Sequence, residues 1–375
     1  MNKTTKWIVG IVVVVIIVFV GYYVSKGPSQ PTSTEPIKIG VVAPFTGDAG
    51  ALGENVKVAI EIARDEINQA GGVNGRDIQV IFEDGKCNGK DAANAATKLI
   101  NIDKVLVVMG MCSAETLAIA PLAEQAKVLL ISPSSTNAKV TTAGDYVFRF
   151  IPSDSFQGKF AADYLINTLG KKKIAILYSL NDWATGIKDV FKQRTEEIGG
   201  TIVGEEGYQQ ESRDLRSQII KLKELNPDAI YFLGYTEATI VGLKQMQELG
   251  VTTTIFGGDA WDDPTIPQKA GAAANGARYS IAANQQLPQS FLDEMKKRPG
   301  GEAMNSYSPR AYDILKVLAG IISETGDNTD KIKNALYKLK DYQGIADKYS
   351  LDANGDIETA NFTIKEMQDG VIVEL

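Results

Sequence analysis

From Ile37 onward, short apolar runs alternate with longer amphipathic stretches, and this alternation limits the folds that the chain can adopt. The runs typical of strands occupy residues 37–44, 78–84, 104–110, 128–132, 147–151, 173–179, 229–234 and 254–258. Most are separated by stretches with helical periodicity, such as residues 55–71. Strands that alternate with helices predict parallel sheets with helices on both faces. Because so many strands in one twisted sheet are uncommon, we expect an α/β protein with two doubly wound sheets in two lobes.

Two consecutive strand ends in residues 110–137 carry small hydroxyl residues. They are Ser113, next to Cys112, after the first strand, and Ser134, Ser135 and Thr136 after the second. Cys112, Ser113 and Ala114 are predicted to open a helix with Glu115 in its first turn, so its N-terminus would point at the gap between the strand ends. Backbone N–H groups and hydroxyls gathered in this way suit one carboxylate. The alternative is that these Ser and Thr residues are ordinary helix caps.

A second set of strand ends carries aromatic and acidic residues, namely Trp183, Tyr235, Asp259 and Trp261. Open α/β sheets bind ligands beyond the carboxyl ends of their strands, so we expect this set to face the hydroxyl set across a cleft. Together the two sets would suit a zwitterion with a side chain. The alternative is that the three aromatic residues are ordinary loop residues.

The composition favours binding over catalysis. The 375 residues contain no histidine, which removes the commonest general base and the commonest metal ligand. The formal net charge is −7 and the only basic triplet is 171–173, which argues against a nucleic-acid partner. No dinucleotide-binding or P-loop motif follows a strand. We therefore expect no catalytic residues, no cofactor and no metal site.

The two cysteines, Cys87 and Cys112, are 25 positions apart, and each follows a predicted strand. In an exported protein, an isolated pair at neighbouring strand ends favours a disulfide. Closing that loop would contribute about 3 kcal/mol in the chain-entropy model. The alternative is a pair of buried free thiols. A metal site is disfavoured because nothing nearby in the sequence completes a ligand set.

The N-terminus contains a segment of 18 uncharged residues, Trp7–Val24. As a helix it would extend about 27 Å, enough to cross a bilayer core. It ends in Tyr22 and Tyr23 without a small-residue cleavage pattern, so we interpret residues 1–24 as an uncleaved membrane anchor, with a cleaved signal peptide as the alternative. Lysines before the segment place the amino end inside and the rest of the chain outside. Residues 25–36 hold three prolines and are predicted to form a linker.

One acidic stretch has the beginning of a calcium loop. Asp352, Asn354 and Asp356 have the spacing, but the sixth and twelfth positions hold Ile357 and Thr363 in place of Gly and Glu. We predict a β-hairpin with an Asn-Gly turn there instead.

With these residues laid out, residues 37–375 resemble type I periplasmic binding proteins. More narrowly, they resemble the branched-chain amino acid (leucine/isoleucine/valine) binding family of ABC transporters. The resemblance rests on residues 37–84, the spacing of the two cysteines, the Cys112-Ser113 pair, ISPSST at 131–136 and FRFIPSDSFQG at 148–158.

The resemblance implies a role for individual ligand-binding residues. Ser113, Ser134 and Thr136, with Ser135 between them, match positions that hold the α-carboxylate and part of the ammonium group. Tyr235 matches an aromatic residue at the ammonium end, and Asp259 matches the acidic partner of the ammonium. Leucine-type binders have Glu at that position, so the shorter Asp259 would meet the amine differently or through water. Trp183 and Leu52 stand where those binders have tyrosines, which leaves the preferred ligand side chain open.

The resemblance also implies the domain organisation and the function. Lobe 1 would comprise 37–153 and 284–345, and lobe 2 would comprise 154–283 and 346–375, joined by a three-stranded hinge. The cleft would close on an amino acid and deliver it to the permease subunits of an ABC importer. The protein would be a monomer on the extracytoplasmic side, tethered by its anchor or secreted if cleaved, and not an enzyme. The alternative is a sensor for a small amide or amino acid that signals through a partner.

Overall fold

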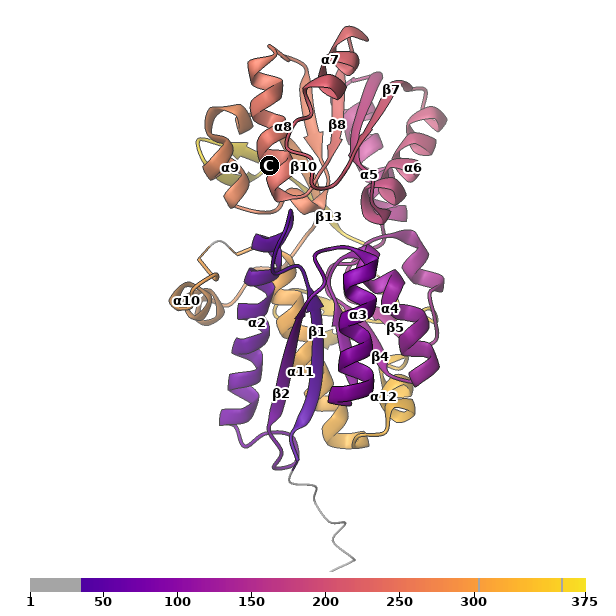
Figure 1. The fold of residues 1–375 in the computed structure, drawn as a ribbon, viewed down its shortest axis with the longest axis vertical. Coiled ribbons are helices and arrows are strands. Elements are labelled where there is room, and N and C mark those ends of the chain that lie inside the picture. The colour runs from indigo at the N-terminus through magenta and orange to yellow at the C-terminus, as the bar shows by residue number, and fades with distance from the viewer. Residues whose placement is uncertain (1–34, 303, 359) are drawn as a thin grey trace, which may run out of the picture.

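The computed structural model describes residues 35–302, 304–358 and 360–375. These residues form two lobes one above the other, each built on its own sheet (Figure 1). The expected anchor at 1–24 and most of the expected linker at 25–36 lie outside the described residues. Within the part of the chain that the structure describes, no helix is long and apolar enough to cross a membrane.

Lobe 1 contains a five-stranded sheet in the order β2-β1-β3-β4-β5, and all of its strands are parallel. The strands are β1 (Ile37–Ala43), β2 (Ile78–Asp84), β3 (Val107–Gly110), β4 (Leu129–Ser132) and β5 (Val147–Arg149). Its helices are α2 (Gly50–Gln69), α3 (Gly89–Lys98), α4 (Ser113–Ala126), α10 (Gln289–Lys297), α11 (Tyr307–Thr325) and α12 (Thr329–Leu336). This is the expected doubly wound arrangement, and it brings the ends of β1, β3 and β4 together at one edge.

Lobe 2 contains a seven-stranded sheet in the order β14-β13-β10-β9-β8-β6-β7. Its strands are β6 (Lys173–Ser179), β7 (Thr201–Tyr208), β8 (Ala229–Leu233), β9 (Thr254–Gly257), β10 (Arg278–Ala282), β13 (Phe362–Gln368) and β14 (Val371–Glu374). Its helices are α5 (Asp154–Asp163), α6 (Asp182–Glu197), α7 (Arg216–Glu224), α8 (Thr236–Glu248) and α9 (Thr265–Ala270). The sheet is mixed, because β13 runs antiparallel to both β10 and β14.

The described chain passes between the lobes three times, after β5, after β10 and before β13 (Figure 1). Just before the third crossing, residues 346–357 lie against lobe 1, whereas the expected boundary assigns them to lobe 2. Tyr349 donates to Asp313 of α11 at 2.8 Å. Asp356 accepts two hydrogen bonds from the fully buried Arg149 of β5, at 2.7 and 2.6 Å.

The expected hairpin around Asn354-Gly355 is wrong beyond its turn. Gly355 has a φ of +77°, and one bridge joins Leu351 to Ile357 around the turn. The chain then leaves for lobe 2, where β13 pairs with β10 and β14. The Asn-Gly turn forms, but the strand that follows it, β13, pairs with strands of lobe 2 instead of completing the hairpin.

Candidate ligand-binding site

A small cavity lies between the lobes, at the carboxyl ends of strands from both sheets. Its volume is about 30 Å³, enough for one or two water molecules. The lining residues are Pro44, Leu52, Met111, Cys112, Ser113, Ser134, Trp183, Tyr235, Asp259, Ala260 and Tyr307. The structure thus brings six of the eight expected site residues together around one cavity: five follow strands, and Leu52 lies in α2.

The lobe 1 wall is formed by two serines at the ends of β3 and β4. Ser113 begins α4, and its Oγ accepts the N–H of Asn137 at 3.2 Å. Its hydroxyl proton therefore stays available for an acceptor in the cavity. The Ser134 hydroxyl donates to the carbonyl of Met111 at 2.7 Å, which leaves its oxygen able to accept. One serine is thus suited to an anionic group and the other to a donor.

Ser135 and Thr136 lie behind this wall and do not line the cavity. Ser135 Oγ lies 2.7 Å from Thr116 Oγ1 and donates to the Met111 carbonyl at 2.9 Å. The carbonyl of Thr136 accepts the N–H of Asp154 at 2.7 Å and Nη1 of Arg149 at 3.1 Å. These hydrogen bonds stabilise the loop after β4 that carries Ser134.

The lobe 2 wall is an aromatic and acidic cluster. Trp183, in the first turn of α6, stacks on Tyr235, which precedes α8, with ring centroids 5.1 Å apart and planes at 22°. Trp183 Nε1 donates to Asp259 Oδ1 at 3.1 Å. The Tyr307 hydroxyl, from the start of α11 in lobe 1, donates to Asp259 Oδ2 at 2.9 Å. Both carboxylate oxygens are therefore oriented, and each keeps a lone pair for a further donor.

Burial raises the pKa of Asp259 to about 6, while the hydrogen bonds from Tyr307 and Trp183 oppose that rise. Asp154, the first residue of α5, is fully buried, and neither of its oxygens has a hydrogen-bond partner among the described residues. Burial and the neighbouring charge of Asp259 hold its pKa well above its usual range. Of the two carboxyl groups, only Asp259 has hydrogen-bond donors within the described chain, from Trp183 and Tyr307, that favour its charged form.

Leu52 and Trp261 differ in their relation to the cavity. Leu52 of α2 lines it. Trp261 is fully buried in lobe 2 and meets Phe232 edge to face at 5.6 Å. A side chain at Gly257 would overlap the Trp261 ring, so this glycine gives the ring its place. For Trp261 the structure shows a core residue rather than a ligand contact.

The sequence reasoning missed Tyr307 and Met111. Tyr307 reaches Asp259 from a helix 48 positions later in the chain and in the opposite lobe. No local motif marks it, because its role depends on how the lobes meet. Met111 stands between the predicted strand and helix, so its position at a strand end was a usable signal.

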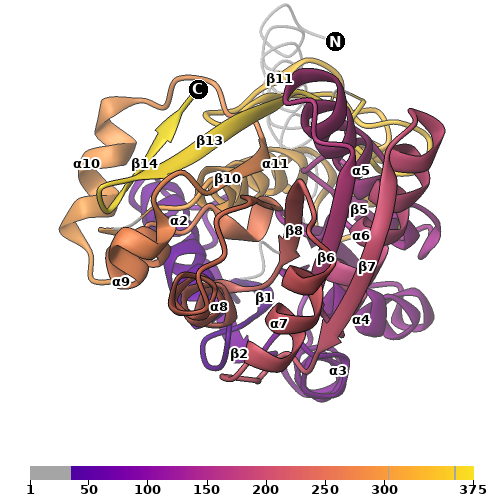
Figure 2. The same cartoon turned by 90° about the horizontal axis from the view of Figure 1, so that it is seen from above.

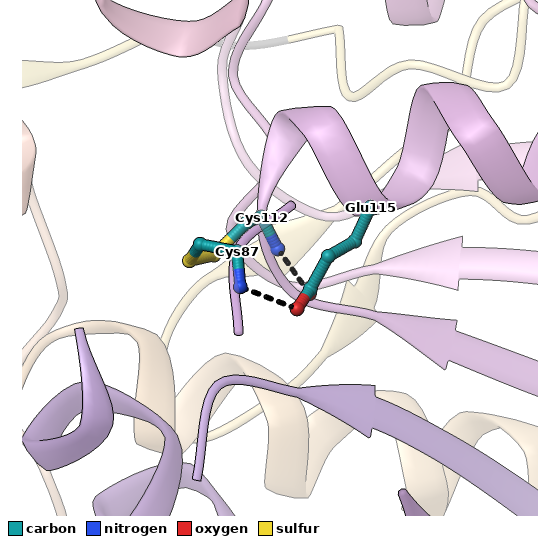
Figure 3. A group of neighbouring side chains, drawn as sticks. All are labelled: Cys87, Cys112 and Glu115. Carbon is teal, nitrogen blue, oxygen red and sulfur yellow. Dashed lines mark hydrogen bonds between the residues drawn. A yellow bond between two sulfur atoms is a disulfide. The ribbon is translucent and has the colours of Figure 1, made fainter. Parts of the chain in front are cut away.

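Behind Ser113, the disulfide Cys87–Cys112 is present, with Cα atoms 5.2 Å apart, which confirms the expected pair and excludes free thiols. Glu115 lies beside it, and its two oxygens accept the N–H groups of Cys87 and Cys112 at 3.0 and 2.9 Å (Figure 3). Because the sulfurs are bonded to each other, this cluster offers no thiolate ligands. Burial raises the pKa of Glu115 to about 8, against the effect of these backbone donors.

Comparison with known proteins finds relatives that match nearly the whole described chain. A family model described as periplasmic binding protein matches residues 36–370. The amino acid binding protein of Pseudomonas aeruginosa is 28% identical over 342 residues, which cover 89% of this chain and 90% of that protein. The leucine binding protein LivK of Thermotoga maritima has a TM-score of 0.83 at 29% identity, covering 90% of this chain and 97% of that one. LivJ of Streptococcus pneumoniae, in complex with isoleucine, has a TM-score of 0.82 at 29% identity, covering 91% and 100%.

Proposed function

Since this chain belongs to the periplasmic binding protein family, we propose that it captures an α-amino acid between its lobes and delivers it to an ABC importer. The family is one of extracytoplasmic solute-binding proteins and not one of enzymes. The observation that carries the choice of ligand is the carboxylate of Asp259. It is buried in the cavity wall, oriented by Trp183 and Tyr307, and no Lys or Arg lines the cavity among the described residues.

A buried carboxylate without a cationic neighbour selects a ligand that brings its own positive charge, because an unpaired charge in such a site is unfavourable. The ligand's ammonium would donate to Asp259 and to Ser134. Its carboxylate would accept from the Ser113 hydroxyl at the N-terminus of α4, where the helix dipole also favours an anion. The apolar lining, with Leu52, Met111 and Pro44, would take an uncharged side chain.

Ligand binding would require the lobes to separate and close again. The cavity of about 30 Å³ is smaller than an amino acid, and it is enclosed by residues from both lobes. A ligand would therefore enter an open form and shift the population towards the closed form. The relatives named for amino-acid and leucine binding support this assignment.

The amino-acid assignment is tested by calorimetry with the twenty amino acids and two truncated analogues of leucine. One analogue, 4-methylpentanoate, lacks the amine, and the other, 3-methylbutylamine, lacks the carboxylate. We expect at least one apolar amino acid to bind. If leucine binds, each of its two analogues should bind more weakly by a factor of about 100 or more, since each leaves buried polar groups unpaired. An amino acid at 100 times its Kd should stabilise the fold by about 2.7 kcal/mol. Binding of no amino acid, or equal binding of 4-methylpentanoate and leucine, would contradict the proposal.

The second part of the proposal concerns location and partners. The hydrophobic segment Trp7–Val24 would tether the protein, a monomer, to the outer face of the cytoplasmic membrane, where permease subunits recognise the closed form. In cells that express the full chain, we expect the protein in the membrane fraction after washing at high pH. Recovery of a shortened protein in the soluble extracytoplasmic fraction would show that the segment is cleaved.

A further inference from the structure

Asp48 connects the two lobes at the edge of the cleft. It lies in the lobe 1 loop between β1 and α2, yet only 1% of its surface is exposed. Its Oδ1 accepts the N–H of Ala238 at 2.9 Å and lies 3.2 Å from Nη1 of Arg213. Its main-chain carbonyl accepts the N–H of Glu237 at 3.3 Å. All three partners belong to lobe 2.

These contacts complete the first turn of α8. Free N–H groups at a helix start are normally capped by the residue that precedes the helix. Here that residue is Tyr235, whose side chain makes no capping hydrogen bond because its ring stacks on Trp183 in the cavity wall. The Thr236 hydroxyl is also engaged, since it donates to Asp263 at 2.7 Å. The opposite lobe therefore supplies the cap that α8 lacks.

We propose that Asp48 is a cross-cleft latch, a positioning residue that caps α8 only when the lobes close and so holds Tyr235 against the ligand. Opening the cleft exposes both Asp48 and the first turn of α8 to water. Part of the stability of the closed form then comes from contacts within the protein, independent of the ligand's own contacts. Asp48 therefore affects the equilibrium between open and closed forms even without ligand. Its effect on ligand affinity, by contrast, is inferred only if the proposed function is correct.

The latch is also sensitive to pH. The charged and titratable groups that face Asp48 from lobe 2 are Arg213, Glu211, Glu237, Tyr208 and Tyr235. Burial raises the pKa of Asp48 to about 7, although Arg213 and the Ala238 N–H oppose the rise. In the open form the carboxyl regains solvent and its ordinary pKa near 3.8. Closure therefore takes up a proton between these values, and the contribution of the latch is greatest at low pH and declines as the pH rises through 7.

Proton uptake does not break the cap, because the structure leaves room for the proton on the other oxygen. Oδ2 of Asp48 is buried and has no hydrogen-bond partner among the described residues. The Ala238 N–H is held by Oδ1 alone. A protonated Asp48 can thus keep its hydrogen bond to α8.

The experiment compares wild type, Asp48→Ala, Asp48→Asn, Arg213→Gln and, as a control, Glu54→Gln in the full chain. Glu54 is half-exposed on the same lobe, where it pairs with Lys57 at 3.8 Å without crossing the cleft. Small-angle scattering gives the radius of gyration without ligand at pH 6 and pH 8, and calorimetry with L-leucine gives Kd. We expect Asp48→Ala to enlarge the ligand-free protein at pH 6 and to weaken L-leucine binding about five- to thirtyfold. Asp48→Asn should recover part of the affinity and remove the change in size between pH 6 and pH 8.

Arg213 lies in an exposed loop, so Arg213→Gln tests the same contact from lobe 2 without disturbing a core. This variant should also have a larger radius of gyration without ligand, as expected for Asp48→Ala. Unchanged radii for Asp48→Ala, Asp48→Asn and Arg213→Gln at both pH values would overturn the latch. That result is independent of whether L-leucine binds. If the radii of the variants change but the wild type binds no amino acid, the latch is supported and the proposed function is rejected.

Discussion

Replacing Asp259 by asparagine is expected to weaken binding of the preferred amino acid by about 30- to 1,000-fold, equivalent to about 2–4 kcal/mol. Asparagine keeps the shape of the side chain but removes the one carboxylate that lines the cavity among the described residues and can pair with an ammonium. It also turns one acceptor into a donor, opposite either Trp183 Nε1 or the Tyr307 hydroxyl. Calorimetry with the amino acid that binds wild type gives the change in Kd.

The matched control is Tyr307→Phe, which removes one hydrogen bond to Asp259 but keeps the charge. It should weaken binding less than Asp259→Asn, by about tenfold. Because burial raises the pKa of Asp259, its charge is unfavourable in the ligand-free fold, so Asp259→Asn should not lower the melting temperature without ligand. An Asp259→Asn protein that binds the amino acid as tightly as wild type would reject Asp259 as the ammonium partner.

Removal of the disulfide has the largest expected effect on stability. With Cys87→Ser and Cys112→Ser together, the free energy of unfolding should fall by about 3–4 kcal/mol, because a cross-link across 25 positions restricts the unfolded chain. The disulfide also joins the loop after β2 to the start of α4, directly before Ser113 of the cavity wall. Urea unfolding, followed by circular dichroism, measures the change.

Two measurements accompany this comparison. Thiol titration of the wild type, unfolded without reductant, should find no free thiol. The Cys87→Ala and Cys112→Ala pair should lose stability to the same extent as the serine pair, since the cross-link and not the side-chain polarity is the cause. An unfolding midpoint unchanged in both double variants, or two titratable thiols in the wild type, would contradict a stabilising disulfide.

Several of the predicted strands are buried along their whole length. The run 128–132 corresponds to β4, whose residues are all buried, and the run 229–234 corresponds to β8, which is buried throughout. By contrast, β7 escaped prediction. It is an edge strand that pairs only with β6, and its sequence TIVGEEGY mixes glycines and glutamates among half-buried positions. Continuous apolar runs mark buried strands, and β7 lacks such a run.

The candidate site was predictable as far as parallel strands determine it. Residues that follow neighbouring parallel strands of one sheet, such as Ser113 and Ser134, meet at the same edge of that sheet. Contacts between lobes, such as Tyr307 with Asp259 and Asp48 with Ala238, depend on the angle of closure, and no local pattern encodes them. The contacts of Tyr349 with Asp313 and of Asp356 with Arg149, just before the third crossing, likewise have no local sequence signal.

The pairing of Arg149 with Asp356 has a consequence for how the chain folds during synthesis. Arg149 is fully buried, and the carboxylate that neutralises it is made 207 residues later. The lobe 2 sheet waits equally long, since β13 inserts between β10 and β14. Neither lobe can therefore reach its final form before these later segments are made, because an unpaired buried guanidinium and an unfilled sheet position are unfavourable. Each lobe therefore gains its full stability only after a segment far along the chain has been synthesised.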